Sequence, residues 1–258
     1  MIFQIIESSS SGNCSFLECD GVRILIDAGI AITKIRSFLA SKNLQLDDID
    51  AVFITHEHSD HYNSLCRFKN CNAKIFANRA TAECIRYKDS CTKNLNWHLF
   101  ETGTEFDFYG IKVRSFSIPH DTSDPVGFYF EHNDKRLVYA TDMGKTTYSV
   151  RDIVSQADVL VLESNYCPKM LERSNRPYYL KARIRGSYGH LSNADTIDLL
   201  KNSVSTNIQK IFLAHISREC NDLDHIADLL NNSGLDSSVL SKIEIVSPFY
   251  KSSSCFEF

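Results

Sequence analysis

The sequence has few residues that break secondary structure and no apolar run long enough to cross a membrane. Only 5 prolines and 10 glycines occur among 258 residues, so no long unstructured linker is expected. No window approaches the roughly 18 consecutive apolar residues of a membrane-spanning helix. The opening residues, MIFQIIESSSSGN, lack the basic stretch that begins a signal peptide. These absences favour a cytoplasmic protein without a membrane anchor.

The net charge and the cysteine spacing bear on nucleic-acid binding, on the redox state of the thiols and on a structural zinc site. The net charge is −4, so a strongly basic coat for nucleic acid is absent, although local basic patches remain possible. The 9 cysteines are odd in number and form no C-x-x-C pair, which favours reduced thiols. One alternative is a structural zinc site, although the spacings are wider than in the usual zinc knuckles. Its ligands would be Cys66, Cys71, Cys84 and Cys91.

The sequence does contain a regular alternation of strand-like and helix-like segments. Hydrophobic residues make up 43% and charged residues 23%, which suits a folded domain with a core. The alternation predicts an α/β fold of two packed sheets between helical layers, in a single domain over residues 1–258. The expected strands are 3–6, 15–18, 22–27, 51–55, 111–118, 126–132, 135–141, 158–164 and 210–215, and the expected helices include 32–39, one that begins at Ser192 and one over about 222–231.

Chemically capable side chains follow four of the predicted strands. His56, Asp142, Glu163 and His215 each stand just after a buried apolar run. Ligand sites in α/β folds lie at the carboxyl ends of strands. The sequence therefore predicts that these residues share one site.

The stretch THEHSDH at 55–61 is the strongest sign of a metal site. His56 and His58 alternate, so an extended loop can direct both imidazoles to one point, while Asp60 and His61 face a second point. Imidazole suits zinc, iron and manganese. Glu57 stands between these ligands and is expected to point away.

Two metal ions need more ligands than this loop supplies. His120, Asp142 and His215 each follow a strand, and their common position favours further ligands over ordinary turn residues. The remaining histidines lie in polar or helical contexts that indicate structural or solvated side chains. They are His98, His132 and His225.

The order of these motifs resembles that of the metallo-β-lactamase superfamily. H-x-H-x-D-H is followed by a single His, a single Asp and a final His. The stretches ESSSSGNCSFLECDGVRILIDAG, SIPHDTSDPVGF, ATDMG, ESNYCP, YYLKARIRGSYGHLSN and FLAHIS run in the order of its YycJ/WalJ branch, which is related to RNase Z and RNase J. The resemblance covers residues 2–220. It implies a four-layer αββα sandwich of two mixed sheets and a homodimer.

The resemblance also implies two divalent ions, zinc or manganese. Two close dications lower the pKa of a shared water and clamp a phosphate, so a hydroxide held between them would attack phosphorus. The first ion would be held by His56, His58 and His120, the second by Asp60, His61 and His215, with Asp142 as a bridge and Asp27 as a support for the metal loop.

The segment from 169 to 190 is locally basic, with six basic residues against one acid, Glu172. Guanidinium forks suit phosphate oxygens and tyrosine faces suit bases, so the segment is expected to contact substrate. The alternative is a solvated loop with ordinary salt bridges. The predicted substrate-binding residues are Lys181, Arg183, Arg185 and Tyr188.

His190, in SYGHLSN, precedes His215 by 25 residues with a predicted helix between them. This arrangement resembles the Gly-His-hydrophobic-Ser/Thr motif of RNase Z-like phosphodiesterases. The resemblance implies that His190 is the general acid for the leaving oxygen and that Glu163 orients it. Asp60 is grouped with these two as a catalytic residue.

These features predict a metal-dependent phosphodiesterase, and a nuclease of the YycJ/WalJ type is favoured. An iron oxidoreductase of this fold is expected to carry a carboxylate in place of His58. Two alternatives stay open: a 3′,5′-cyclic nucleotide phosphodiesterase of the anti-Pycsar kind, and a metal-binding module without catalysis. Acidic charge and the lack of an added nucleic-acid domain favour the cyclic substrate. The polar turn at 8–13 either touches substrate or only closes the first hairpin.

Overall fold

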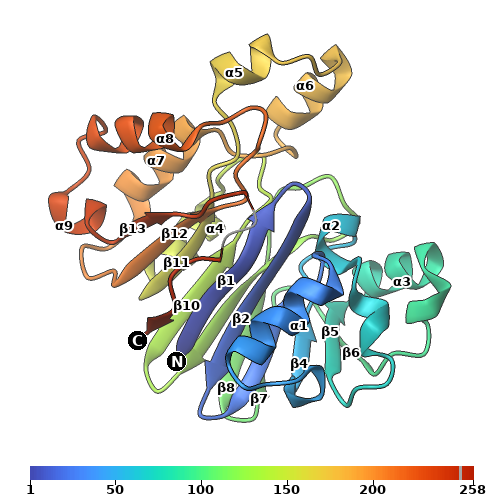
Figure 1. Ribbon diagram of the computed structural model, residues 1–258. Coiled ribbons are helices and arrows are strands. Elements are labelled where there is room, and N and C mark those ends of the chain that lie inside the picture. The colour runs from blue at the N-terminus through green and yellow to red at the C-terminus, as the bar shows by residue number, and fades with distance from the viewer. Residues whose placement is uncertain (250–251) are drawn as a thin grey trace.

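The computed structural model describes residues 1–249 and 252–258 and contains two sheets packed face to face, with helices outside each (Figure 1). The first sheet, in spatial order, consists of β14 (Phe256–Glu257), β1 (Ile2–Ser9), β2 (Gly12–Cys19), β3 (Val22–Ile26), β4 (Ala51–Phe53), β5 (Lys74–Asn78) and β6 (Trp97–Phe100). The second consists of β13 (Ile243–Ile245), β12 (Lys210–Ala214), β11 (Val159–Glu163), β10 (Lys135–Ala140), β9 (Val126–His132), β8 (Ile111–Ser117) and β7 (Glu105–Phe108).

The helices form two outer layers and one projecting hairpin (Figure 1). The first sheet is flanked by α1 (Ile32–Ser41), α2 (Ser59–Tyr62), α3 (Arg79–Lys88) and the 3-10 turns η1 (Leu46–Asp48), η2 (Leu65–Phe68) and η3 (Ser90–Thr92). The second is flanked by α4 (Tyr148–Ser155), α7 (Asn193–Ser203), α8 (Leu223–Asn231) and α9 (Ser237–Leu240). The short helices α5 (Pro168–Arg173) and α6 (Tyr178–Arg185) project beyond the strand ends. None of the helices in the described residues is long and apolar enough to span a bilayer.

The sheets are held together by a core rich in phenylalanine. Phe53 lies fully buried at its centre, with ring centroids 5.5 Å from Phe128 and 5.4 Å from Phe130 on the opposite sheet. Fully burying one such side chain contributes about 1.5–3 kcal/mol. Two further apolar clusters attach the outer helices to the sheets. The predicted four-layer αββα arrangement is confirmed.

Local sequence signals specify several element boundaries. Asp20 and Gly21 join β2 to β3 with φ of 47° and 85°, as a two-residue hairpin turn of this composition requires. Ser192 caps α7: its hydroxyl accepts from the Asp195 amide, and the Asp195 carboxylate accepts from the Ser192 amide. The basic segment forms helices α5 and α6 rather than a loop, and it carries the salt bridges that the alternative named, among them Arg185–Glu172.

Cysteine pairing differs from the sequence-based expectation. Cys66 and Cys91 form a disulfide, with Cα atoms 5.6 Å apart, so the prediction of reduced thiols is wrong for this pair. The other cysteines are free. Because Cys71 and Cys84 remain outside the bridge, the alternative of a zinc site with four cysteine ligands is also wrong. The bridge joins η2, just after the metal loop, to η3.

Candidate metal centre

Parallel strand pairs bring the predicted site residues to one edge of the sandwich. β3 runs parallel to β4, and β10 runs parallel to β11, which pairs in parallel with β12. Asp27, Asp142 and His215 stand just after three of these strands, with left-handed φ values of 60°, 60° and 51°. Such conformations are unfavourable for residues other than glycine and cluster at functional sites. They turn these side chains from the strand direction into a common space.

Three imidazoles form the first ligand cluster. Nε2 of His56 lies 3.1 Å from Nδ1 of His58, and Nε2 of His120 lies 3.2 Å from the same Nδ1. The three nitrogens are close enough to ligate one ion together. His56 and His120 are buried, and His58 is partly exposed.

A second cluster lies beside the first. Nε2 of His61 is 3.4 Å from an Asp60 oxygen, and Nε2 of His215 is 3.8 Å from the same oxygen. Asp142 reaches both clusters: Oδ1 lies 3.4 Å from His215 Nε2 and 3.8 Å from His120 Nε2, and Oδ2 lies 3.5 Å from His61 Nε2. All seven residues predicted as ligands therefore converge on one space.

The far sides of the imidazoles are held by hydrogen bonds. Nδ1 of His61 donates to Asp27 Oδ2 at 2.7 Å, and Nδ1 of His120 donates to the Gly189 carbonyl at 3.0 Å. Thr55 Oγ1 donates to Asp27 and lies 3.0 Å from Nδ1 of His56. Partners of this kind fix the ring orientation and leave the other nitrogen free for a cation.

Glu163 is the most highly connected of these partners. Its side chain is fully buried. Oε1 accepts from Nδ1 of His190 and from Nδ1 of His215, both at 2.8 Å. Oε2 accepts from the backbone amides of Met143 and Leu191, both at 3.0 Å. One carboxylate therefore positions both the last predicted ligand and the predicted proton donor.

Electrostatics divide the histidines into two groups. Burial, helped by the neighbouring imidazoles, lowers the pKa of His56 well below its usual range and that of His58 to about 4. These two rings are therefore neutral, as ligation requires. Burial alone would also lower the pKa of His215, but Asp142, Asp60 and Glu163 raise it to about 10. This half of the site attracts positive charge, which a metal ion can supply in place of a proton.

Two buried atoms support the fit of the site to metal. Asp142 Oδ2 and His215 Nε2 are buried and have no hydrogen-bond partner among the described residues. Leaving a buried polar atom unsatisfied costs about 1–3 kcal/mol. Nδ1 of His215 already donates to Glu163, so when a cation replaces the second ring proton, Nε2 presents its lone pair toward the cluster. The donor set, of imidazoles and carboxylates, suits a divalent transition metal.

Glycines allow two loops to approach this centre. A Cβ on Gly29 would lie 1.6 Å from the Asp60 carbonyl oxygen. A Cβ on Gly144 would lie 2.3–2.4 Å from the backbone of the 187–189 loop, and one on Gly189 would lie 2.2 Å from backbone oxygens of α6. The glycines of DAG, ATDMG and SYGH are therefore required by contact between backbones.

Replacing Gly29 by alanine should displace the metal loop and destabilise the fold. Overpacking of this kind costs about 1–3 kcal/mol. For a chain of this size, roughly 2–4 °C of melting temperature is lost per kcal/mol. Thermal unfolding and metal analysis would measure the effect. Gly186→Ala is the matched control, since its nearest atoms are 3.3 Å away and its φ is −68°. Equal melting temperatures and metal contents in both variants would contradict this explanation of Gly29.

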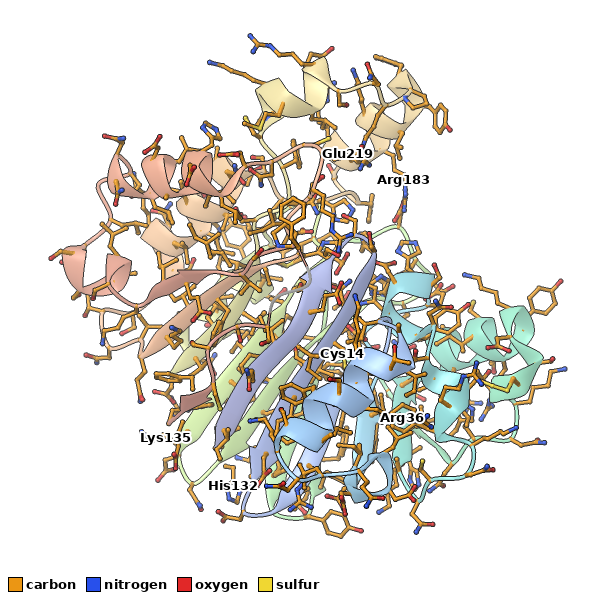
Figure 2. All side chains as sticks on the ribbon, viewed as in Figure 1. Cys14, Arg36, His132, Lys135, Arg183 and Glu219 are labelled. Atoms are coloured by element: carbon orange, nitrogen blue, oxygen red, sulfur yellow. A yellow bond between two sulfur atoms is a disulfide. The ribbon has the colours of Figure 1, made fainter. Side chains whose placement is uncertain are left out.

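A cavity of about 310 Å³ opens over the metal cluster. It is lined by Ser10, His58, Ser59, Asp60, Asp142, Asn165, Arg176, Leu180, Arg183, Ile184, His190, His215 and Ser217. Helix α6 thus supplies one wall. In Figure 2, Arg183 extends from this helix toward the strand ends.

The four predicted substrate-binding residues occupy different places. Arg183 lines the cavity, whereas Lys181, Arg185 and Tyr188 do not. Lys181 donates to the carbonyl of Glu172, and Arg185 forms an ion pair with the Glu172 carboxylate. Tyr188 is 59% exposed. Arg176, which belongs to the same basic segment but is not among the predicted substrate-binding residues, also lines the cavity.

Several residues outside the predicted site set also hold the site together, although the sequence marks one of the segments involved, the turn at 8–13, as polar. Asn165 donates to the carbonyl of His215 at 2.7 Å. In the turn at 8–13, Ser8 accepts from the His215 amide at 2.9 Å, and Asn13 donates to Asp60 Oδ2 at 3.2 Å. This turn braces the site as well as closing the hairpin. Glu57 points away, as expected, and its Oε1 accepts from the Ser123 amide.

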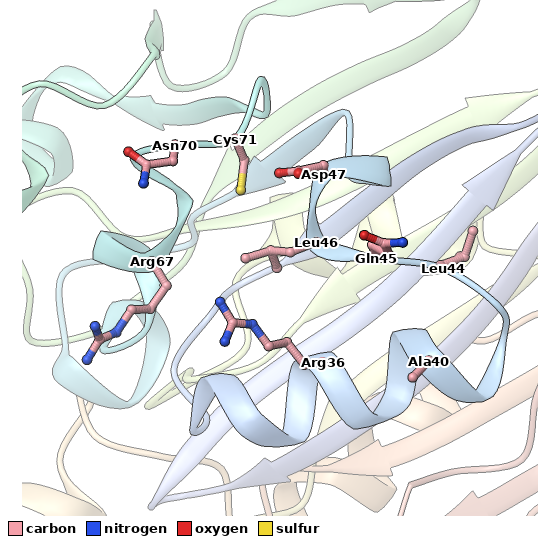
Figure 3. Close-up of a pocket in the computed structure, with 9 residues that line it drawn as sticks. All are labelled: Arg36, Ala40, Leu44, Gln45, Leu46, Asp47, Arg67, Asn70 and Cys71. Atoms are coloured by element: carbon pink, nitrogen blue, oxygen red, sulfur yellow. The ribbon is translucent and has the colours of Figure 1, made fainter.

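A larger cavity, of about 470 Å³, lies elsewhere and contains none of the predicted ligands (Figure 3). Arg36 of α1 and Asp47 of η1 are among its lining residues. This larger cavity contains no imidazole among its described lining residues, so the smaller cavity over the metal cluster is the candidate site.

The match to known families agrees with this geometry. Residues 22–216 match the family model described as the beta-lactamase superfamily domain. The chain belongs to this superfamily, and it is a metal-dependent hydrolase. The resemblance to the YycJ/WalJ branch is confirmed by two relatives.

Exodeoxyribonuclease WalJ of Streptococcus pneumoniae is 34% identical over 222 residues, which cover 85% of this chain and 82% of the relative. Exodeoxyribonuclease YycJ of Bacillus anthracis is 27% identical over 220 residues, with coverage of 85% and 83%. The zinc-bound structure of PqqB from Methylobacterium extorquens is similar over 100% of both chains, with a TM-score of 0.78 and 14% identity. At that identity the likeness concerns the fold.

Proposed function

We propose that the chain is a binuclear phosphodiesterase that hydrolyses DNA, as the names of its relatives WalJ and YycJ describe for those proteins. The observation that carries the proposal is the position of the Glu163–His190 pair. His190 of this pair lines the same cavity as several of the converging ligands, and the buried Glu163 holds its ring from behind. A site with ligands alone could bind metal, whereas a positioned imidazole beside them can also transfer a proton.

The converging side chains divide into two ligand sets for zinc or manganese. His56, His58 and His120 would hold the first ion, and Asp60, His61 and His215 would hold the second; Asp142, which faces both clusters, would serve both. When bound, the ions activate a water molecule and neutralise charge on the phosphate oxygens. Asp27 and Glu163 keep His61 and His215 in the required orientation.

His190 holds the proton for the leaving group. Nδ1 donates to Glu163, so Nε2 is the nitrogen free to face a substrate. The buried carboxylate fixes the orientation of the ring, which suits a general acid. The side chain is 16% exposed, enough to meet a bound molecule while the ring stays fixed.

A cyclic mononucleotide is the second candidate substrate. The cavity of about 310 Å³ lies at the lower end of the range for small-ligand sites, about 300–1,000 Å³. A site of this size admits one nucleotide at a time, either as a free cyclic molecule or as the end of a polymer.

Purified protein supplied with manganese, incubated separately with end-labelled DNA and with cyclic CMP, would distinguish the two substrates. We expect degradation of DNA that stops on chelation, with cyclic CMP left intact. Hydrolysis of cyclic CMP with intact DNA would overturn the nuclease proposal and support the second candidate.

Replacing Asp142 by alanine should remove both metal and activity. Its carboxylate faces both ligand clusters, so the loss should exceed the roughly 10–100-fold typical of losing an outer partner of a metal ligand. Metal content by mass spectrometry and the rate of DNA hydrolysis provide the measurements. Asp152→Ala, on an exposed face of α4, is the control. A variant that keeps two ions per chain would argue against a bridging role.

A further inference from the structure

Asp121 directly follows His120 but belongs to neither ligand cluster. Its Oδ1 lies 3.6 Å from Nε2 of His120 and 3.7 Å from Nε2 of His58. Its side chain is 30% exposed. The carboxylate therefore stands at the rim of the first cluster, between buried ligands and solvent.

The same carboxylate accepts two hydrogen bonds from an arginine of a distant segment. Arg183 of α6 donates from Nη2 to Asp121 Oδ1 at 3.0 Å and from Nε to Oδ2. Such paired hydrogen bonds fix the plane of a guanidinium as well as its position. The pair spans 62 residues of sequence and ties helix α6 to the loop after β8 that carries His120.

Other ion pairs of the hairpin do not make this connection. Arg185 pairs with Glu172, and Arg176 pairs with Glu219. Neither acid lines the cavity over the metal cluster. Of the arginine–carboxylate ion pairs found in the described residues, Arg183–Asp121 is the one that reaches a predicted ligand.

We propose that Asp121 is a positioning residue that holds the Arg183 guanidinium against the cavity, where it binds a phosphate of the substrate. A guanidinium has five N–H donors, and Asp121 engages two of them. One donor on Nη2 and both on Nη1 remain for phosphate oxygens. The inference rests on the proposed function, because it assumes a phosphodiester substrate.

The expected effect is on substrate binding rather than on metal binding. Asp121→Ala should raise KM for DNA by about tenfold or more, because a mobile guanidinium loses the benefit of being held in place. The metal content should remain that of the wild-type protein. Arg183→Ala should raise KM similarly. In the double variant the effects should not add, because each substitution disables the same contact. Asp121→Asn keeps one acceptor and should have an intermediate KM.

The test combines steady-state kinetics, metal analysis and binding of a fluorescein-labelled oligonucleotide measured by anisotropy. Glu172→Ala, which frees Arg185 on the same hairpin, is the matched control and should leave KM and binding unchanged. Fully additive effects of the two alanine variants, or loss of metal in Asp121→Ala, would overturn the inference. If the wild-type protein hydrolyses no phosphodiester but its binding of the oligonucleotide depends on the pair without additivity, the proposed function fails and the positioning role stands.

Discussion

Glu163→Gln should lower the rate of DNA hydrolysis by roughly 10²–10⁴-fold and weaken metal retention. Losing an outer partner of one metal ligand typically costs 10–100-fold in affinity or activity. Glu163 orients two histidines, His190 and His215, so both proton transfer and ligation are affected. An amide has the shape of the carboxylate, but its NH2 group is a donor and would face two of the four donors that converge on Glu163.

The same variant should unfold at a lower temperature. Met143 and Leu191 donate backbone amides to the buried carboxylate, and a buried donor left unsatisfied costs about 1–3 kcal/mol. Calorimetry, metal analysis and turnover on one preparation would separate the effects. Glu131→Gln is the control, because that carboxylate bonds Tyr129 and Lys112 away from the site. A variant with wild-type metal content and rate would refute the central position given to Glu163.

His190→Ala should reduce DNA hydrolysis by roughly 10²–10⁴-fold while leaving metal content unchanged. In the proposed reaction the imidazole is needed because the alkoxide leaving group of DNA requires a proton. A substrate that releases p-nitrophenolate, such as bis(p-nitrophenyl) phosphate, needs less protonation of its leaving group. The variant should therefore hydrolyse it with a much smaller loss of rate. The ratio of the two losses therefore reports proton donation specifically.

His225→Ala, on α8 outside the cavity, provides the control for general effects of removing a histidine. Equal losses on both substrates would exclude a role as general acid. Loss of metal along with activity would instead make His190 a ligand, which its hydrogen bond to Glu163 argues against.

Much of the fold follows from local signals in the sequence. Strand 126–132 coincides with β9, and the cap at Ser192 begins α7 at the expected residue. The convergence of His56, Asp142 and His215 follows from a general property of α/β folds, because residues after parallel strands meet at one edge. Side chains at such positions can therefore be grouped from the sequence alone.

Contacts between distant segments lie beyond that kind of reasoning. The Arg183–Asp121 pair joins positions 62 residues apart. The second hydrogen bond of Glu163, to His215, crosses 52 residues. The Cys66–Cys91 bridge likewise depends on how α3 returns toward η2. These contacts depend on tertiary packing rather than on local periodicity, so single-sequence patterns do not reveal them.

The proposed chemistry depends above all on one set of residues holding two divalent ions. Anomalous X-ray diffraction at the absorption edge of the bound metal would locate these ions. We expect two peaks, one among His56, His58 and His120 and one among Asp60, His61 and His215, with Asp142 contacting both. A single peak, or two peaks without Asp142 between them, in crystals of fully loaded protein would contradict the binuclear site.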